Sequence, residues 1–249
     1  MRVTLRMLRL GTVRFAEAIA LARKQGVVLP EVYYGLLQGA ARDQAFSIAG
    51  IASLAQLEDV WTDLQRSLAD GETFADWQGR ASTMSLRLPE HRLDNIYRTN
   101  LQSAWNRGRS EQIQRNRRTH PWLRYDAVND SRTRPAHAAM DGKIFHIDDP
   151  IWQIWYPPCG YRCRCRVIAM TDAEAKRRIK IGQDAGSDPT ARPAVDPDEG
   201  WDYPRLVAGV NPEGLRRAVA DSAMRSAFRG VLGVAARFGE LLRGLGRRG

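Results

Sequence analysis

Apolar residues recur at helical spacing through the N-terminal third of the chain. Phe15, Ile19 and Ala22 fit one helical face, and Gly26 interrupts that segment before Pro30 opens the next. The apolar positions continue at the same spacing as far as Phe46. We therefore expect two antiparallel helices, the second running from Pro30 through Phe46.

Two further helices have recognisable ends. Ser53 is a good N-cap for an apolar-periodic segment through Leu68, and Asp70-Gly71 is a stop signal. Thr73 precedes a short segment with Trp77 and predicts one more helix. Residues 1–88 are thus predicted to be an N-terminal helical region, and they contain no cluster of titratable residues that would suggest catalysis.

The longest periodic stretch begins at Pro89 and predicts one helix to about Asn116. Its apolar stripe runs through Leu93, Tyr97 and Leu101, and the other positions are rich in arginine. These arginines are either an ordinary solvated helix face or a nucleic-acid-binding surface. The candidates for DNA contact are Arg107, Arg109, Arg115, Arg117 and Arg118.

The pattern changes after His120-Pro121. Alternating residues from Leu123 to Ala127 predict a short strand, and Thr133 can cap a short helix that holds His137 and ends at Gly142. A second strand is expected at 143–146.

The segment from Tyr161 alternates between two side-chain types. Tyr161, Cys163, Cys165 and Val167 would share one face of a strand, with arginines at 162, 164 and 166 on the other face. Thr171-Asp172-Ala173-Glu174 is a capping box, which predicts a helix to about Ile181. Residues 89–181 are therefore expected to form a long helix followed by a small α+β module.

The C-terminal part has a different composition. Residues 182–210 are acidic and rich in glycine and proline, as in a linker or an extended arm on the surface. Residues 211–249 predict a basic helix that several glycines weaken. The expected fold class is α+β, with a helical N-terminal half, a long basic helix, a small sheet-containing module and extended C-terminal segments.

The chain is strongly basic. Its formal net charge is +10, and only four of its 38 basic residues are lysines. Such a charge favours polyanionic partners, and arginine suits phosphate, although a GC-rich genome also explains the arginine usage. No apolar run approaches the roughly 20 residues of a membrane span. We expect a protein made in and kept in a cytoplasm, with no membrane association.

All three cysteines lie between residues 159 and 165. Cys163, Cys165 and the upstream His137 could converge on one ion, with Cys159 as a fourth ligand of a structural zinc. Two alternatives are open: the cysteines are reduced core residues beside an interior histidine, or two of them form a disulfide. No cofactor is therefore certain from the sequence.

Catalytic interpretations have less support. A Cys–His pair would need an orienting carboxylate such as Asp126, Asp130 or Asp141. A metal-dependent nuclease or other DNA-acting enzyme could use Asp126, Asp130, His137, Asp148 and Asp149, but their spacing does not require it. We expect a protein that is not an enzyme, with the nuclease as the alternative.

A series of short motifs carries a resemblance to a known family. The runs D-S-R-T-R-P-A-H-A-A-M-D-G-K-I-F, D-D-P-I-W and Y-P-P-C-G-Y-R-C-R-C-R-V follow one another, and R-T-N-L-Q-S-A-W-N-R-G-R precedes them. Together they resemble the signature of the bacteriophage Mu F-type minor head proteins, the phage head morphogenesis family. The family pattern falls on Arg134, His137, Gly142, Pro158, Gly160, Cys163, Arg164 and Cys165.

The resemblance implies a minor virion protein located inside the head near the portal. Its partners would be the portal protein, the major capsid protein and phage DNA, which it would contact without sequence specificity. It would act in head morphogenesis and in DNA packaging or delivery. Cys159 stands where family members often have another residue, so the resemblance does not extend to a fourth metal ligand.

Overall fold

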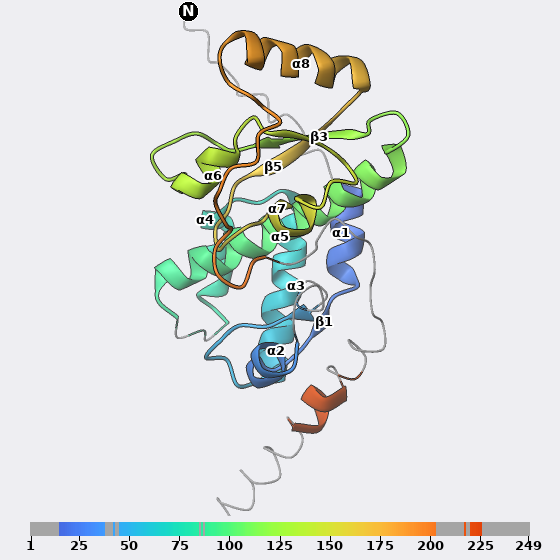
Figure 1. Cartoon of the computed structure of the whole chain (residues 1–249). Helices are drawn as coiled ribbons and strands as arrows, with labels where there is room; N and C mark the ends of the chain where they lie inside the picture. Colours follow the sequence, from blue (N-terminus) through green and yellow to red (C-terminus); the bar gives the residue numbers. More distant parts are fainter. Residues whose placement is uncertain are drawn as a thin grey trace, which may run out of the picture. The chain divides into compact units, whose positions relative to one another are not determined.

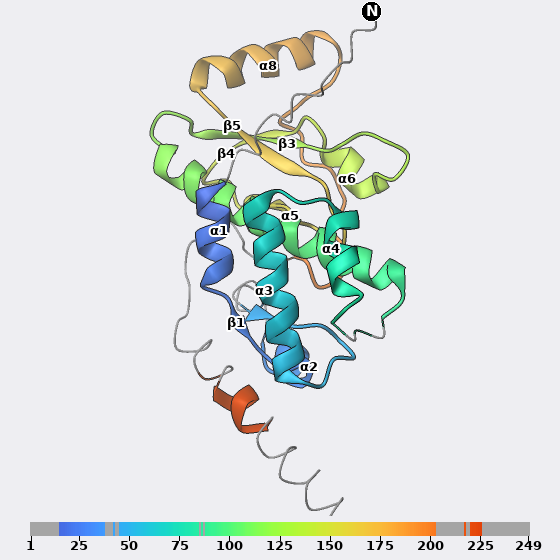
Figure 2. The same cartoon turned by 180° about the vertical axis from the view of Figure 1, so that it is seen from behind.

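The fold is described here from a computed structural model of the chain (Figures 1 and 2). The structure describes residues 15–37, 42, 45–84, 86, 88–202, 217 and 220–225. The chain divides into two compact units. One comprises Met1–Arg23 with Thr62–Ala208, and the other comprises Lys24–Trp61 with Gly209–Gly249.

The unit that contains Lys24–Trp61 includes a small parallel sheet. Strand β1 (Gly26–Val27) pairs with β2 (Ala45–Phe46), and helix α2 (Pro30–Gly35) lies between them in sequence. The predicted helix from Pro30 through Phe46 is therefore wrong beyond Gly35. Phe46 pairs with Val27 and stacks on Trp61 at 4.6 Å between ring centroids, and these long-range contacts outweigh the local helical spacing.

The C-terminal segment belongs to the same unit. The buried main-chain N–H of Leu29 donates to the hydroxyl of Ser222 at 3.1 Å. Residues 220–225 are helical, within the predicted helix 211–249. Most of that prediction, and the basic residues before Phe15, lie outside the described residues.

The predicted helix ends of the N-terminal half are largely confirmed. Helix α1 spans Ala16–Arg23, and α3 spans Leu54–Asp70, followed by Gly71 in a left-handed conformation (φ 65°). Helix α4 (Phe74–Ala81) has a capping box between Thr73 and Asp76. Helix α5 spans Glu90–Asn116, the predicted length.

The larger unit contains a three-stranded antiparallel sheet with strand order β4-β3-β5. The strands are β3 (Trp122–Asp126), β4 (Ile144–His146) and β5 (Arg166–Met170), with short helices α6 (Pro135–Met140) and α7 (Trp152–Trp155) between them. Helix α8 (Asp172–Asp184) starts at the predicted capping box of Thr171 and Glu174. The α+β class is thus confirmed.

The sheet lies between α8 on one face and α5 with α7 on the other (Figures 1 and 2). Alternate strand residues face α8, which contributes Ala175 to the smaller cluster with Ile144 and Met170. The opposite face builds the main core with α5 and α7, and its strand residues include Leu123, Tyr125, Phe145 and Val167. The period-two burial expected of a covered sheet is therefore present on both faces.

The segment with the cysteines is not a strand. Ladder pairing of β5 begins at Arg166, and the left-handed backbone of Arg162 (φ 56°) lies outside the β region. The carbonyl oxygen of Cys165 accepts hydrogen bonds from two side chains of α5, Gln102 and Asn106. These contacts take the place of a strand partner. Cys163, Cys165 and Val167 are buried together, whereas Tyr161, which was predicted to share their face, is 49% exposed.

Residues 187–202, here called the arm, form an extended segment on the sheet module. The arm has no helix or strand of its own, and α8 runs to Asp184, slightly past the predicted end. The main-chain N–H of Ile144 donates to the carbonyl of Pro189 at 2.9 Å, and Arg192 forms an ion pair with Asp149. The sequence was compatible with a linker or an arm, and the structure has an arm.

Among the described residues, no helix combines the length and the apolar character needed to cross a lipid bilayer.

Candidate metal centre

His137, Cys163 and Cys165 come together in the core of the sheet module. The Nδ1 atom of His137 lies 3.4 Å from the Cys165 sulfur and 3.7 Å from the Cys163 sulfur. Each residue offers one ligand atom, and the three atoms lie within 4.8 Å of one another. Within the described part of the chain, no other group of three or more potential metal ligands has its ligand atoms so close together.

Local structure places each of the three side chains. His137 lies in α6, which starts at Pro135 and is followed by Gly142 with a left-handed backbone (φ 74°). The cysteines follow a turn in which the Cys163 N–H donates to the Gly160 carbonyl at 3.2 Å. That turn is attached to α5, because the Arg162 N–H donates to the Thr99 hydroxyl at 3.0 Å.

Aromatic rings close the site from the core side. The Trp155 ring meets Tyr125 and His137 edge-on, at centroid distances of 5.9 and 5.8 Å. The Tyr125 hydroxyl and the His137 Nε2 atom are both buried without a hydrogen-bond partner among the described residues. Unsatisfied buried polar atoms are rare in folded proteins. Nε2 lies on the side of the ring away from the sulfurs, since Nδ1 is the atom that faces them.

The two cysteines differ in acidity. The hydrogen bond from the Cys165 thiol, and then that from His137, hold the pKa of Cys163 well below its usual range despite burial. Donating to Cys163, together with burial, raises the pKa of Cys165. Cys163 therefore loses its proton first, and a thiolate is the form of cysteine that binds metal.

Access to the cluster is narrow. A cavity of about 20 Å³ borders His137, Cys163 and Cys165, roughly the space that one water molecule needs. Pockets for small-molecule substrates are typically about 300–1,000 Å³. The three side chains are 2–3% exposed, so the site suits an ion and has no room for an organic substrate.

Cys159 is buried next to this group but is not part of it. Its sulfur is not among the ligand atoms that lie within 4.8 Å of one another. Its carbonyl oxygen accepts a hydrogen bond from the Asp198 N–H at 3.1 Å. Its role as a fourth ligand stays a prediction.

The remaining signature residues surround the cluster. Arg134 donates to the Tyr161 carbonyl at 2.7 Å, and Arg164 holds Asp130 through two hydrogen bonds of 2.5 and 2.6 Å. Pro158 and Gly160 are buried in the turn that carries the cysteines. The motifs singled out in the sequence are therefore one structural assembly.

Comparison with known proteins agrees with this assembly. The family model described as phage Mu protein F like protein matches residues 58–168. The expected resemblance to the Mu F-type proteins is confirmed. The matched Mu F-like region contains α5, His137 and both cysteines of the cluster.

Two curated proteins show the same relationship. The Putative capsid assembly protein F of Escherichia phage Mu is 29% identical, with 75% of this chain and 53% of that protein covered. The Mu-like prophage FluMu F protein of Haemophilus influenzae is 35% identical, with 59% of this chain and 40% of that protein covered. The chain thus spans about half or less of these relatives' length. The comparison with solved structures found no significant match.

The carboxylates considered for catalysis do not gather around His137 in the Mu F-like region. Asp126 pairs with Arg166, Asp148 with Arg117 and Asp149 with Arg192. Asp130 is bound by Arg164, whereas Asp141 accepts the main-chain N–H of Ala127. The geometry therefore gives the nuclease interpretation no cluster of carboxylates at the candidate metal centre.

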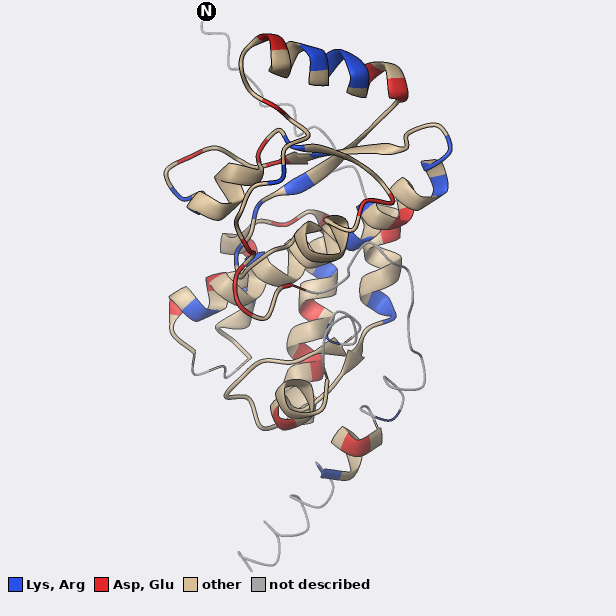
Figure 3. Cartoon of the chain, in the orientation of Figure 1, with Lys and Arg blue, Asp and Glu red and all other residues tan. Residues whose placement is uncertain are grey.

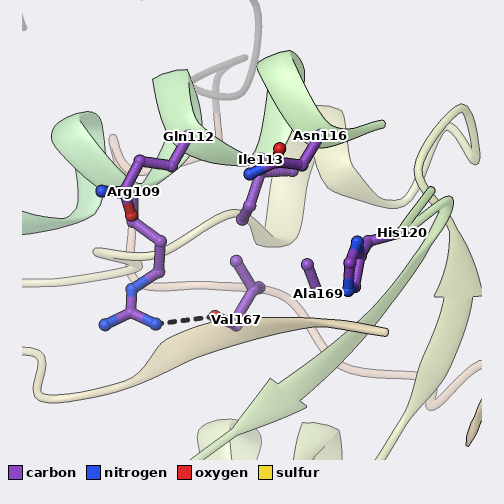
Figure 4. A pocket seen from close by; sticks show the side chains of 7 residues that line it. All are labelled: Arg109, Gln112, Ile113, Asn116, His120, Val167 and Ala169. Carbon is purple, nitrogen blue, oxygen red and sulfur yellow. Dashed lines mark hydrogen bonds between the residues drawn. The ribbon is translucent and has the colours of Figure 1, made fainter. Parts of the chain in front are cut away.

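The five arginines proposed for DNA contact do not share one face of α5. Arg109 points toward the sheet and donates to the Val167 carbonyl at 3.5 Å, beside a cavity of about 160 Å³ (Figure 4). The Nε atom of Arg107 is also buried. Arg115 pairs with Glu17 and Glu111. Their role in DNA binding stays a prediction, with Arg117 and Arg118 exposed beyond the end of the helix.

Sequence reasoning missed a second basic surface, on α8. Basic residues occupy the middle of this helix (Figure 3), and Lys176, Arg177, Arg178 and Lys180 are all exposed. Four basic residues within five positions were the available signal. Sequence reasoning also missed Asp198, Tyr125 and Trp155. These residues lie around the cluster of His137 and the cysteines but belong to no metal-binding motif.

Proposed function

We propose that this chain is a minor head protein of a tailed bacteriophage that acts in head assembly. The observation that carries the proposal is the match of residues 58–168 to the Mu F-like family, one member of which is called a capsid assembly protein. By the same resemblance, we place the protein inside the head near the portal, in contact with portal protein and major capsid protein. It would act there in DNA packaging or delivery.

The architecture supports a scaffolding role over a catalytic one. The unusual side chains of the Mu F-like region are buried, and the cavity beside them holds about one water molecule. The surrounding arginines are engaged with carboxylates or main-chain oxygens, as Arg164 is with Asp130. Such a network fixes the loops around the cluster instead of leaving groups free for a reaction.

We also propose that His137, Cys163 and Cys165 hold a structural zinc ion. An imidazole nitrogen and two sulfurs are a suitable donor set for zinc, and the fourth tetrahedral position would be filled by solvent or by Cys159. The ion would supply folding free energy by joining α6 to the turn before β5. The burial of all three side chains and the convergence of their ligand atoms within 4.8 Å support an ion at this place.

DNA contact is the third part of the proposal. Lys176, Arg177 and Arg178 on α8 are exposed basic side chains, and Arg118 lies in the exposed segment after α5. Arginine and lysine at such positions bind phosphates without reading sequence. Binding of this kind would suit a protein that meets packaged DNA.

The role in assembly can be tested in a phage that encodes this chain. A nonsense mutation within the gene should give few filled heads, and supplying the chain in trans should restore them. Crosslinking in the complemented heads should join this chain to the portal protein. Normal numbers of infectious particles without the chain would refute the proposed function.

A further inference from the structure

The arm places one carboxylate against the far side of the His137 ring. The Oδ1 atom of Asp198 lies 3.7 Å from the His137 Nε2 atom, while Nδ1 of the same ring faces the two sulfurs. His137 is 2% exposed and its Nε2 has no hydrogen-bond partner among the described residues. The ring is thus held between sulfurs on one side and a carboxylate on the other.

We propose that Asp198 is a positioning residue of the metal centre and that the docked arm completes the site. This inference rests on the proposed zinc site. A histidine that ligates metal through one ring nitrogen usually donates its other N–H to a carboxylate or carbonyl, which fixes the tautomer and makes the ligating nitrogen more basic. Asp198 supplies that acceptor for Nε2–H and leaves Nδ1 free to bind the ion.

The distance fits a site that tightens on binding. A separation of 3.7 Å exceeds the roughly 3.2 Å limit of a direct N–H···O bond, so a small rotation of the ring or the carboxylate is needed. Binding of the ion to Nδ1 would make Nε2–H a stronger donor and draw the two groups together. The other carboxylate oxygen stays 3.2 Å from the Arg134 guanidinium.

Three contacts hold Asp198 at this position. Its N–H donates to the Cys159 carbonyl at 3.1 Å, and its carbonyl accepts from Trp201, whose ring packs edge-on against Tyr161 at 5.0 Å. Arg134 holds the carboxylate while also donating to the Tyr161 carbonyl. The arm is therefore fixed to the same turn that carries the cysteines.

Gly160 makes the close approach of Asp198 feasible. A Cβ atom added at Gly160 would lie 2.2 Å from the Asp198 Oδ2 atom and 2.6 Å from its Cγ. Gly160 is not among the glycines with a left-handed backbone, so alanine is compatible with its main chain. Alanine at 160 would thus displace the carboxylate while keeping every polar group of the site.

Of the arm's carboxylates, Asp198 is the one with a described contact to the His137 ring. Asp188 binds Thr190 within the arm, whereas Asp196 is exposed and lies two residues before Asp198. Asp196→Ala is therefore a matched control, because it removes a carboxylate from the arm without touching the His137 ring.

The test compares zinc affinity in full-length protein by competition with a coloured chelator. Asp198→Ala should weaken zinc binding about 10–100-fold, the usual effect of removing such a partner. Gly160→Ala should change the affinity in the same direction, and Asp196→Ala should leave it unchanged. Zinc affinity equal in the Asp198→Ala, Asp196→Ala and unsubstituted proteins would overturn the inference while leaving the zinc site intact.

A second readout separates this inference from the zinc proposal. If the unsubstituted chain binds no zinc, the zinc proposal fails, and the His137 tautomer can still be read from ¹⁵N chemical shifts of the metal-free protein. Nε2 should carry a proton in that protein even though Nδ1–H can donate to the sulfurs, and Asp198→Ala should lower the fraction of rings with a proton on Nε2. Identical shifts in both proteins would overturn the positioning role.

Discussion

The main chain of Ala18 leaves no room for a side chain at Gly108. A Cβ atom added at Gly108 would lie 2.6 Å from the Ala18 nitrogen and 2.9 Å from its Cα. Because these are main-chain atoms of α1, they cannot rotate away. Helices α1 and α5 can therefore approach this closely only with glycine at position 108. Beside this contact, the Phe15 and Trp105 rings pack with their centroids 5.0 Å apart.

Gly108→Ala should destabilise the protein by about 1–3 kcal/mol, the usual cost of overpacking a tight contact. Gly79→Ala is the matched control, since Gly79 lies inside α4 and an added Cβ would meet no atom within 4 Å. That control should stabilise the protein by up to about 1 kcal/mol through helix propensity. Denaturant unfolding measures both effects, and equal stability of the two variants would contradict the assigned contact.

The Arg80 side chain, in the last turn of α4, binds two residues of α3 and Glu72 in the turn between the two helices. Its guanidinium bonds Asp63 at 2.8 Å, Glu72 at 2.8 Å and the Ser67 hydroxyl at 3.0 Å. The hydrogen bond from Arg80 lowers the pKa of Glu72. The stabilisation from Glu72 is therefore present above its unfolded pKa of about 4.3 and is lost as pH falls through the lower folded value.

Glu72→Gln should remove this dependence. The unfolding free energy of the unsubstituted protein should fall more steeply below about pH 4.3 than that of the variant. Near neutral pH the variant should be less stable by about 1 kcal/mol. The loss of stability is small because the Arg80 and Glu72 side chains are both partly exposed, and solvent weakens their attraction. Parallel stability curves between about pH 3 and pH 7 would show that Arg80 does not stabilise the ionised carboxylate.

The basic residues of α8 predict a salt-dependent interaction with DNA. Replacing Lys176, Arg177 and Arg178 together by glutamine should weaken binding. It should also reduce the slope of log K against log salt by about 0.9 for each phosphate that the protein no longer neutralises. The comparison variant replaces Arg115, Arg117 and Arg118 together by glutamine. It should weaken DNA binding less, because Arg115 and Arg117 already form ion pairs with acidic side chains.

The two variants locate the DNA surface. Weaker binding by the comparison variant than by the α8 variant would move that surface to the end of α5. Binding of the unsubstituted chain that does not change with salt would argue against phosphate contact altogether.

The fold was predictable where the determining contacts are local. The capping box of Thr171 and Glu174 starts α8, and Gly71 and Gly142 end their segments with left-handed backbones. Helix α5 has the predicted length, although its buried positions include Asn106, Gly108 and Ser110 beside apolar residues. Each of these features depends on residues within a few positions of one another.

The errors came from contacts between distant residues. Phe46 belongs to a strand because it pairs with Val27, a contact that the spacing of apolar residues does not encode. The cysteine segment leaves the strand pattern because Gln102 and Asn106 of α5 bind the Cys165 carbonyl. The sequence did predict that His137 would meet Cys163 and Cys165, although it assigned the cysteines to the wrong local structure.

Asp198 illustrates the part of the site that lay beyond sequence reasoning. It lies in an arm without periodicity, 61 positions after His137 in the numbering, and no metal-binding motif includes it. Its position follows from the docking of the arm on the Cys159–Tyr161 turn, through Arg134 and the Cys159 carbonyl. Only the folded chain brings this carboxylate to the ring.

Cys159 distinguishes two compositions of the zinc site. Because its sulfur lies outside the group of converging ligand atoms, Cys159→Ala should retain bound zinc. Cys163→Ala and Cys165→Ala should each abolish zinc binding, since a His–Cys pair alone rarely holds zinc in a structural site. Absence of zinc from the Cys159→Ala protein, with the fold intact, would establish Cys159 as the fourth ligand.

The most direct test of the account is elemental analysis of the purified full-length chain. It predicts one zinc ion per chain, absent from a His137→Ala variant, and a lower melting temperature of the unsubstituted protein after treatment with a strong chelator. A chain purified in zinc-containing medium that carries no metal, and whose melting temperature does not change with added zinc or with chelator, would contradict it.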